Sequence, residues 1–140
     1  MTEDEVNAFA SAYRQHLEAI DLPKPVRELT SLNPHDAHIL DVEHEPSAET
    51  LRLRLRCGDL QTGYFDALVV FSGVAIRPDE AAALVEARRP AEFEILCDEV
   101  DRVDGGAFEY RLLLHPVGEV ALQFADVAVV RRRVADRREV

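Results

Sequence analysis

Phe71-Ser72-Gly73-Val74-Ala75-Ile76 is a stretch that the chain repeats, with changes, as Phe124-Ala125-Asp126-Val127-Ala128-Val129. Each copy follows an apolar, arginine-bearing strand pattern and a polar turn. In the second copy the apolar positions change parity across Ala125-Asp126, and in the first copy a glycine stands at the corresponding place. Both features are typical of a β-bulge. The repeat therefore predicts two related β-meanders, each with a bend in its third strand.

The pattern around the two meanders predicts helices. Apolar residues recur at helical spacing from Val6 to Ile20, and Pro78 opens a second helical segment with acids in its first turn. Because tight turns join antiparallel strands, we expect an α+β fold. It would contain one antiparallel sheet of about six strands, an N-terminal helix and a short helix between the meanders. The expected single domain comprises a helical segment over 1–34, a first meander over 37–76, a helix over 78–89, a second meander over 92–131 and a basic tail over 132–140.

Strand alternation also predicts which side chains share a face. Leucines at positions 51, 53 and 55 alternate with arginines at 52, 54 and 56, and the preceding strand carries three acids at alternating positions. If the two strands form a hairpin, the acids can face the arginines, which would fix the register more than it adds stability. In the second meander the same alternation places Ile95 and Cys97 on the apolar face and Asp98 on the solvated face.

Charge and composition limit the classes of partner. The chain of 140 residues has 27 acidic residues against 16 lysines and arginines, a formal net charge of -11. Such a field repels nucleic acid and anionic membranes and favours a basic protein partner. The acidic N-terminus and the lack of a long apolar run predict a soluble, cytoplasmic protein. Cys57 and Cys97 belong to no CxxC pair and are expected to be reduced, buried thiols.

Two sets of residues are candidate sites. The first is an acidic patch for binding a partner, formed by Asp41, Glu43, Glu45, Asp98, Glu99 and Asp101. The second is an alternative metal or small-ligand site at His35, Asp36 and His38, since imidazole and carboxylate groups bind zinc and similar metals. The sequence contains no P-loop, GxGxxG or HExxH motif, so we predict no catalytic residue and no cofactor, and lean against an enzyme.

A resemblance rests on several short motifs between residues 35 and 130. They are His35-Asp36-Ala37, Phe71-Ser72-Gly73-Val74, Phe108–Leu114, Gly118-Glu119-Val120 and Phe124-Ala125-Asp126-Val127. In these motifs the chain resembles a loose group of small, mostly uncharacterised bacterial α+β domains, some of which look like immunity proteins. The resemblance implies a non-enzymatic protein-binding role. Two alternatives stay open: the metal-assisted or ligand-binding enzyme, and a structural domain that forms homo-oligomers.

Overall fold

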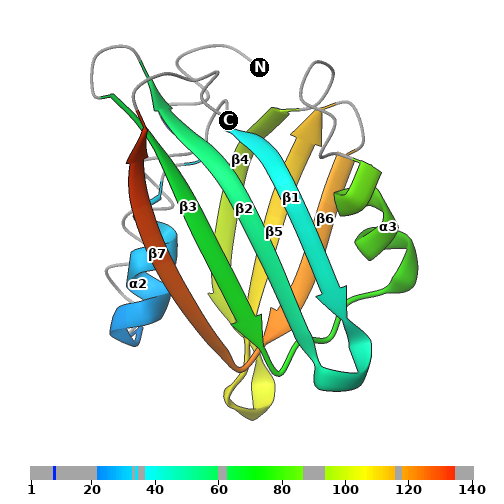
Figure 1. Ribbon diagram of the computed structural model, residues 1–140. Coiled ribbons are helices and arrows are strands. Elements are labelled where there is room, and N and C mark those ends of the chain that lie inside the picture. The colour runs from blue at the N-terminus through cyan, green and yellow to red at the C-terminus, as the bar shows by residue number, and fades with distance from the viewer. Residues whose placement is uncertain are drawn as a thin grey trace.

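The computed structural model describes residues 8, 22–32, 34, 37–59, 63–86, 94–115 and 118–134 (Figure 1). Except for residue 8, the expected N-terminal helix lies outside this part of the chain, as do the residues after Val134. The elements in order are α2 (Lys24–Thr30), β1 (His38–Glu45), the 3-10 turn Pro46–Ala48, β2 (Thr50–Asp59), β3 (Gly63–Ser72), α3 (Pro78–Glu86), β4 (Glu94–Arg102), the 3-10 turn Asp104–Gly106, β5 (Phe108–His115), β6 (Gly118–Phe124) and β7 (Asp126–Val134).

The strands form two antiparallel sheets. Sheet A has the order β1-β2-β3-β7 and sheet B the order β4-β5-β6, and every neighbouring pair is antiparallel. The predicted α+β class with antiparallel strands and a helix between the meanders is confirmed. The prediction of one sheet of about six strands is wrong, because the described residues form one sheet of four strands and one of three.

The two copies of the repeated stretch explain the difference, because each one carries the chain between the sheets. Beyond Gly73, which has a φ of 65°, Ala75 leaves sheet A and exchanges two 2.9 Å backbone hydrogen bonds with Gln123 of β6. In the second copy β6 ends, the chain bends at Ala125, and β7 begins in sheet A. The two crossings are joined, since the Ala125 amide donates to the Ser72 carbonyl at 2.9 Å. A β-bulge and a passage from one sheet to the other both shift the apolar positions by one residue. The local sequence pattern therefore could not distinguish them.

The core lies between the two sheets. Leu51, Leu53 and Leu55 are fully buried on the inner face of sheet A, as the alternation predicts. From β3, the Phe71 ring lies 5.6 Å from that of Tyr110 in sheet B and 5.0 Å from that of Phe124. Aromatic pairs at these spacings add to the free energy gained by burying apolar surface. The aromatic contacts therefore hold sheet A against sheet B near the crossings.

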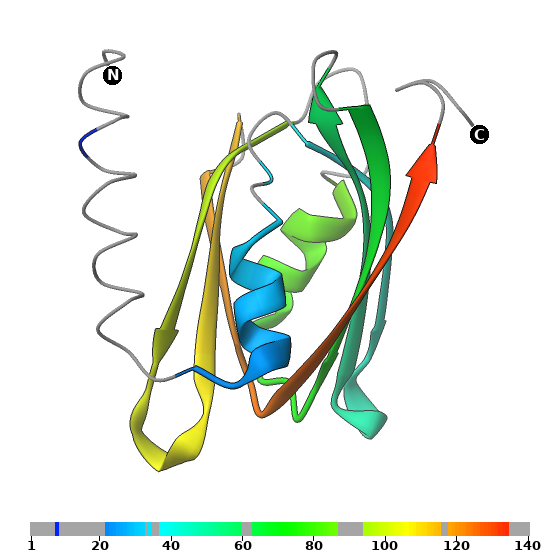
Figure 2. The same ribbon diagram turned by 90° about the vertical axis from the view of Figure 1, so that its left-hand side faces the viewer.

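The two described helices lie at opposite open sides of the space between the sheets, α2 beside β7 and α3 beside β1 and β6 (Figure 1). The sheets converge where β6 leads into β7 (Figure 2). The helix α2 packs against β7 and buries Val26 and Leu29. Its end is tied to the same strand by Arg131, whose guanidinium donates to Ser31 Oγ at 2.8 Å. The helix α3 contacts β1 of sheet A and β6 of sheet B, and its Leu84 is fully buried. The helices thus complete a core that the two sheets alone would leave open.

The register between β1 and β2 confirms part of the predicted hairpin. Asp41 lies opposite Arg54, and Glu43 lies opposite Arg52. The third expected pair does not form, because Glu45 lies opposite Thr50 and His38 lies opposite Arg56. Arg56 is instead opposite Asp66 on β3, where it makes the contacts described below.

Candidate functional site

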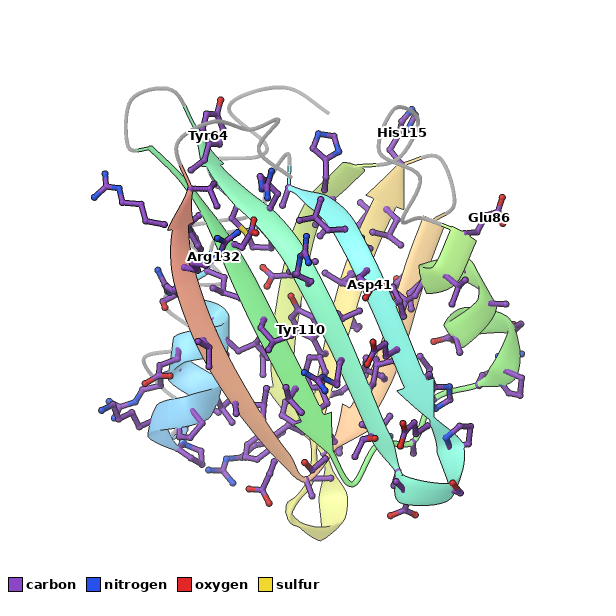
Figure 3. All side chains as sticks on the ribbon, viewed as in Figure 1. Asp41, Tyr64, Glu86, Tyr110, His115 and Arg132 are labelled. Atoms are coloured by element: carbon purple, nitrogen blue, oxygen red, sulfur yellow. The ribbon has the colours of Figure 1, made fainter. Side chains whose placement is uncertain are left out.

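The outer face of sheet A, which points away from sheet B, carries two rows of side chains that cross all four strands. One row runs from Asp41 through Arg54 and Leu68 to Val130, and the other runs from Glu43 through Arg52 and Val70 to Ala128. Each row is charged on β1 and β2 and apolar on β3 and β7. Figure 3 labels Asp41 on β1, at the charged side of this face.

The apolar half of this face forms a strip of four neighbouring residues: Leu68, Val70, Ala128 and Val130. Leu68 and Val70 are half-buried, whereas Val130 is 62% exposed, the highest value for a large hydrophobic side chain among the described residues. Single exposed apolar residues are normal on proteins, whereas large contiguous apolar patches are typical of interaction surfaces. We call these four residues the apolar strip.

A buried ion pair lies beside the apolar strip. Arg56 donates to both carboxylate oxygens of Asp66, at 2.6 and 3.0 Å, and the two residues are only 3% and 5% exposed. Arg132 on the upper part of β7 in Figure 3 reaches the same carboxylate at 3.3 Å. Burial raises the pKa of Asp66, but the hydrogen bonds and charge of Arg56 outweigh it and lower the pKa below its ordinary value. The pair therefore links β2, β3 and β7 as a charged unit.

The six acids expected to form one patch are divided among three environments. Asp41, Glu43 and Glu45 share the outer side of β1 in sheet A. Glu99 and Asp101 lie on the outer face of sheet B, where Arg111 binds Glu99 at 2.5 Å and Glu109 at 3.2 Å. The structure thus brings together the three acids of β1 but separates them from those of β4.

Asp98 occupies the third environment, the inner face of sheet B. Its predicted place on the solvated face is wrong, because a register shift between Ile95 and Cys97 reverses the alternation. The phenol of Tyr110, itself buried on β5, donates to Asp98 Oδ2 at 3.0 Å. Burial raises the pKa of Asp98 to about 7, although the hydrogen bond from Tyr110 acts in the opposite direction. Asp98 is thus a half-buried carboxyl group on the inner face of sheet B, with a pKa close to neutral pH.

The thiol of Cys57 is buried on the inner face of sheet A. Burial raises its pKa to about 12, the charges of Asp66 and Asp98 raise it too, and only the charge of Arg131 acts to lower it. The thiolate is the nucleophilic form of cysteine. Cys57 is therefore a packing residue, as its position among apolar strand residues predicted.

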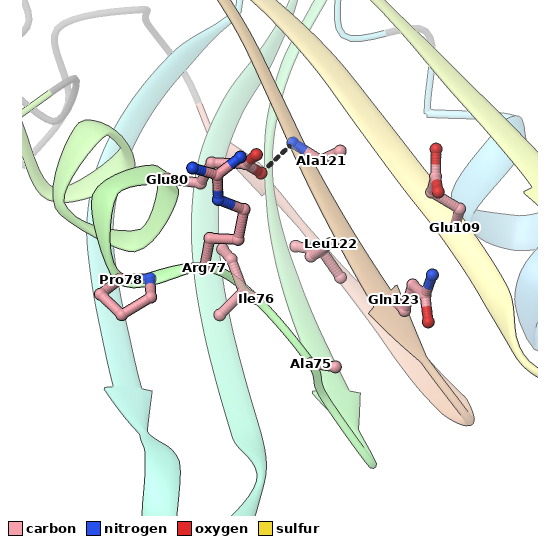
Figure 4. A pocket seen from close by; sticks show the side chains of 9 residues that line it. All are labelled: Ala75, Ile76, Arg77, Pro78, Glu80, Glu109, Ala121, Leu122 and Gln123. Carbon is pink, nitrogen blue, oxygen red and sulfur yellow. Dashed lines mark hydrogen bonds between the residues drawn. The ribbon is translucent and has the colours of Figure 1, made fainter.

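A groove opens between the start of α3 and the edge of β6 that faces away from β5 (Figure 4). Its volume is about 550 Å³. We call it the β6 groove, and it is lined by Ala75, Ile76, Arg77, Pro78, Glu80, Glu109, Ala121, Leu122 and Gln123. Glu80 Oε2 accepts a 2.7 Å hydrogen bond from the Ala121 amide across the groove. No single motif in the sequence marks this site, because α3, β5 and β6 each contribute to it.

The alternative metal site falls mostly outside the described residues. His35 and Asp36 are not among them, and His38 stands at the first position of β1, half-buried and opposite Arg56. Within the residues that the structure places, no group of three or more His, Cys, Asp or Glu side chains could hold a metal ion.

Comparisons with known proteins do not assign a function to these surfaces. No family model, no curated protein and no solved structure matches the chain. The resemblance to immunity-type domains stays a prediction. In the described part of the chain, neither helix has the length and apolar character needed to cross a membrane.

Proposed function

We propose that this chain is a non-enzymatic, immunity-type module that binds a basic protein partner through the outer face of sheet A. The observation that carries the proposal is the apolar strip, in which Val130 is 62% exposed beside the half-buried Leu68 and Val70. Protein interfaces combine an apolar centre with a polar rim. Here the rim is the charged half of the same face, with Asp41 and Glu43 on β1.

The charges of the chain support a basic partner. The net charge of -11 attracts cationic proteins over a distance and speeds their association. At contact, Arg52 and Arg54 stand opposite the acids of β1, so the face presents both signs in a fixed order. A partner would need complementary charges beside an apolar residue that covers Val130. In this proposal the electric field of the net charge sets the rate of association, and the apolar strip contributes most of the affinity.

The test is to capture partners with the tagged full-length chain, purify the captured protein and titrate it by calorimetry. Val130→Asp is expected to weaken binding at least tenfold, because it places a charge in the apolar strip. Leu113→Asp is the matched control, since Leu113 is 37% exposed on the outer face of sheet B and should leave the affinity unchanged. Equal losses in the two variants, or none in Val130→Asp, would contradict the proposal.

A second measurement tests the electrostatic part. Replacing Asp41, Glu43 and Glu45 by their amides should slow association and flatten its dependence on salt, with a smaller change in the dissociation rate. Stopped-flow mixing at 0.05 and 0.5 M salt separates the two rates. A salt dependence that survives the triple variant would show that the acids of β1 do not steer the partner.

Homo-oligomer formation is the second candidate, because the apolar strip ends on β7, an edge strand of sheet A. Two copies could pack strip against strip around a two-fold axis. Sedimentation velocity across a hundredfold range of concentration distinguishes this case. A dimer that Val130→Asp dissociates and Leu113→Asp preserves would favour it over a separate partner.

A further inference from the structure

The edge of β6 that faces away from β5 accepts a strand from the chain itself, but only over a short length. Ala75 exchanges two 2.9 Å backbone hydrogen bonds with Gln123, in the antiparallel sense. Residues two apart in a strand direct their backbone groups to the same side, so the amide of Ala121 points to the same edge. If the pairing continued, Arg77 would lie opposite Ala121. Instead Pro78 begins α3 and the chain turns away.

The carboxylate of Glu80 takes the place of the missing strand. Its Oε2 accepts the Ala121 amide at 2.7 Å, where an adjacent strand would supply a carbonyl oxygen (Figure 4). Among the described residues, no strand pairs with β6 between Ala121 and Gly118 on this edge. A half-buried amide left without an acceptor is destabilising, which explains why a side chain bonds it. An incoming strand could displace Glu80 and supply the acceptor itself.

The β6 groove gives an incoming segment room and a preferred charge. Its volume of about 550 Å³ falls within the range of small-ligand pockets, roughly 300–1,000 Å³. Glu80, Glu109 and Arg77 line it. Arg77 pairs with Asp79 at 3.3 Å and Glu109 pairs with Arg111 at 3.2 Å, so the carboxylate of Glu80, bonded to the Ala121 amide, supplies the charge that an incoming segment meets. Ile76 and Leu122 supply apolar contact. The lining therefore favours a segment with apolar residues and a lysine or arginine.

We propose that the β6 groove binds an extended, basic peptide segment of a partner protein, which adds a strand to the edge of sheet B and displaces Glu80 from the Ala121 amide. Strand addition gives affinity through main-chain hydrogen bonds, and side-chain pockets give selectivity. This site is separate from the outer face of sheet A and does not depend on the function proposed for that face.

The probe is the peptide acetyl-Val-Lys-Val-Lys-Val-amide, titrated into the full-length chain and followed by amide NMR shifts. The expected shifts centre on Glu119, Ala121 and Gln123. The same peptide with N-methylated valines cannot form the ladder and should bind at least tenfold more weakly. Equal binding by the two peptides, or shifts confined to other strands, would overturn the proposal.

Variants at Glu80 separate the backbone contact from the charge. Glu80→Ala leaves the Ala121 amide without its acceptor, so the neutral peptide acetyl-Val-Thr-Val-Thr-Val-amide should bind about fivefold more tightly, the gain expected for one hydrogen bond. Glu80→Gln keeps an acceptor but removes the charge, so the preference for the lysine peptide over acetyl-Val-Glu-Val-Glu-Val-amide should fall. Glu86→Gln, on the exposed end of the same helix, is the control and should change neither result.

Discussion

The rings of Phe71 and Phe124 lie 5.0 Å apart at an interplanar angle of 61°, and each is the first residue of one copy of the repeated stretch. The two crossings between the sheets therefore begin in contact. Directly after them, the Ala125 amide donates to the Ser72 carbonyl at 2.9 Å. The repeat thus specifies the place where both sheets are joined, and its small residues, Gly73 and Ala125, lie where these two segments of the chain approach each other.

The first prediction concerns this approach. A Cβ atom on Gly73 would lie 2.7 Å from the Cβ atom of Ala125, and the φ of Gly73 is 65°. Gly73→Ala should therefore lower the free energy of unfolding by about 2–4 kcal/mol, from backbone strain and overpacking together. Chemical denaturation measures the change.

The matched control for Gly73 is Gly105, which has a φ of 85° and no atom within 4 Å of its added Cβ. Gly105→Ala should cost only the backbone part, about 1 kcal/mol. In the Gly73→Ala background, Ala125→Gly should recover part of the loss, because it removes the clash and keeps the strain. No recovery in the double variant would show that the approach to Ala125 is not the cause.

The second prediction concerns the buried pair of Arg56 and Asp66. Arg56→Met leaves a carboxylate that is 5% exposed without its bidentate partner and should destabilise the fold by about 3–5 kcal/mol. Arg132→Met removes only a 3.3 Å contact from a side chain that is 64% exposed, so it should cost less than about 1 kcal/mol. Urea denaturation of both variants gives the comparison.

The same pair predicts a loss of stability in acid. The folded-state pKa of Asp66 is lowered, so its contribution is present above the ordinary value of 3.8 and disappears as the pH falls through the folded-state value. In the double variant Arg56→Met, Asp66→Leu this part of the pH dependence should vanish. If the double variant loses stability below pH 4 as steeply as the wild type, other carboxylates are responsible.

The sequence predicted the leucine and arginine faces of β2 because strict alternation reports which side of a strand is buried. It failed at Asp98, where a single extra residue near Leu96 changes the parity. A signal was present: Val100 is apolar and shares parity with Asp98, not with Ile95. The change in the parity of the apolar positions is of the same kind as the change across Ala125-Asp126. Local alternation could not predict which strands pair, because strand pairing and the contacts between sheets depend on the path of the whole chain.

The third prediction follows from the inward place of Asp98. Its pKa is raised from 3.8 to about 7, so between these values the folded state binds more protons than the unfolded state. Stability should therefore fall as the pH rises from about 4 to 7 and then level off. One pKa unit corresponds to about 1.4 kcal/mol, so the fall amounts to a few kcal/mol at most.

Asp98→Asn tests this sign directly. The amide keeps an acceptor for Tyr110 and cannot ionise, so the variant should be more stable than the wild type at pH 8 and lose the slope between pH 4 and 7. Asp101→Asn, on the outer face of the same sheet, is the control and should keep the slope. Thermal unfolding in buffers from pH 4 to 8 measures all three proteins, and a slope that persists in Asp98→Asn would contradict the assignment.

The last prediction concerns Tyr110, whose hydroxyl donates to Asp98 at 3.0 Å. A hydrogen bond donated to a carboxylate stabilises its charged form and lowers its pKa. Tyr110→Phe removes only this donor and keeps the ring against Phe71. The pKa of Asp98 should therefore rise above about 7, and the loss of stability should extend to higher pH. Carboxyl-carbon NMR of Asp98 follows the titration in both proteins. An unchanged or lower pKa in Tyr110→Phe would contradict the prediction, because it would mean that the phenol does not stabilise the carboxylate.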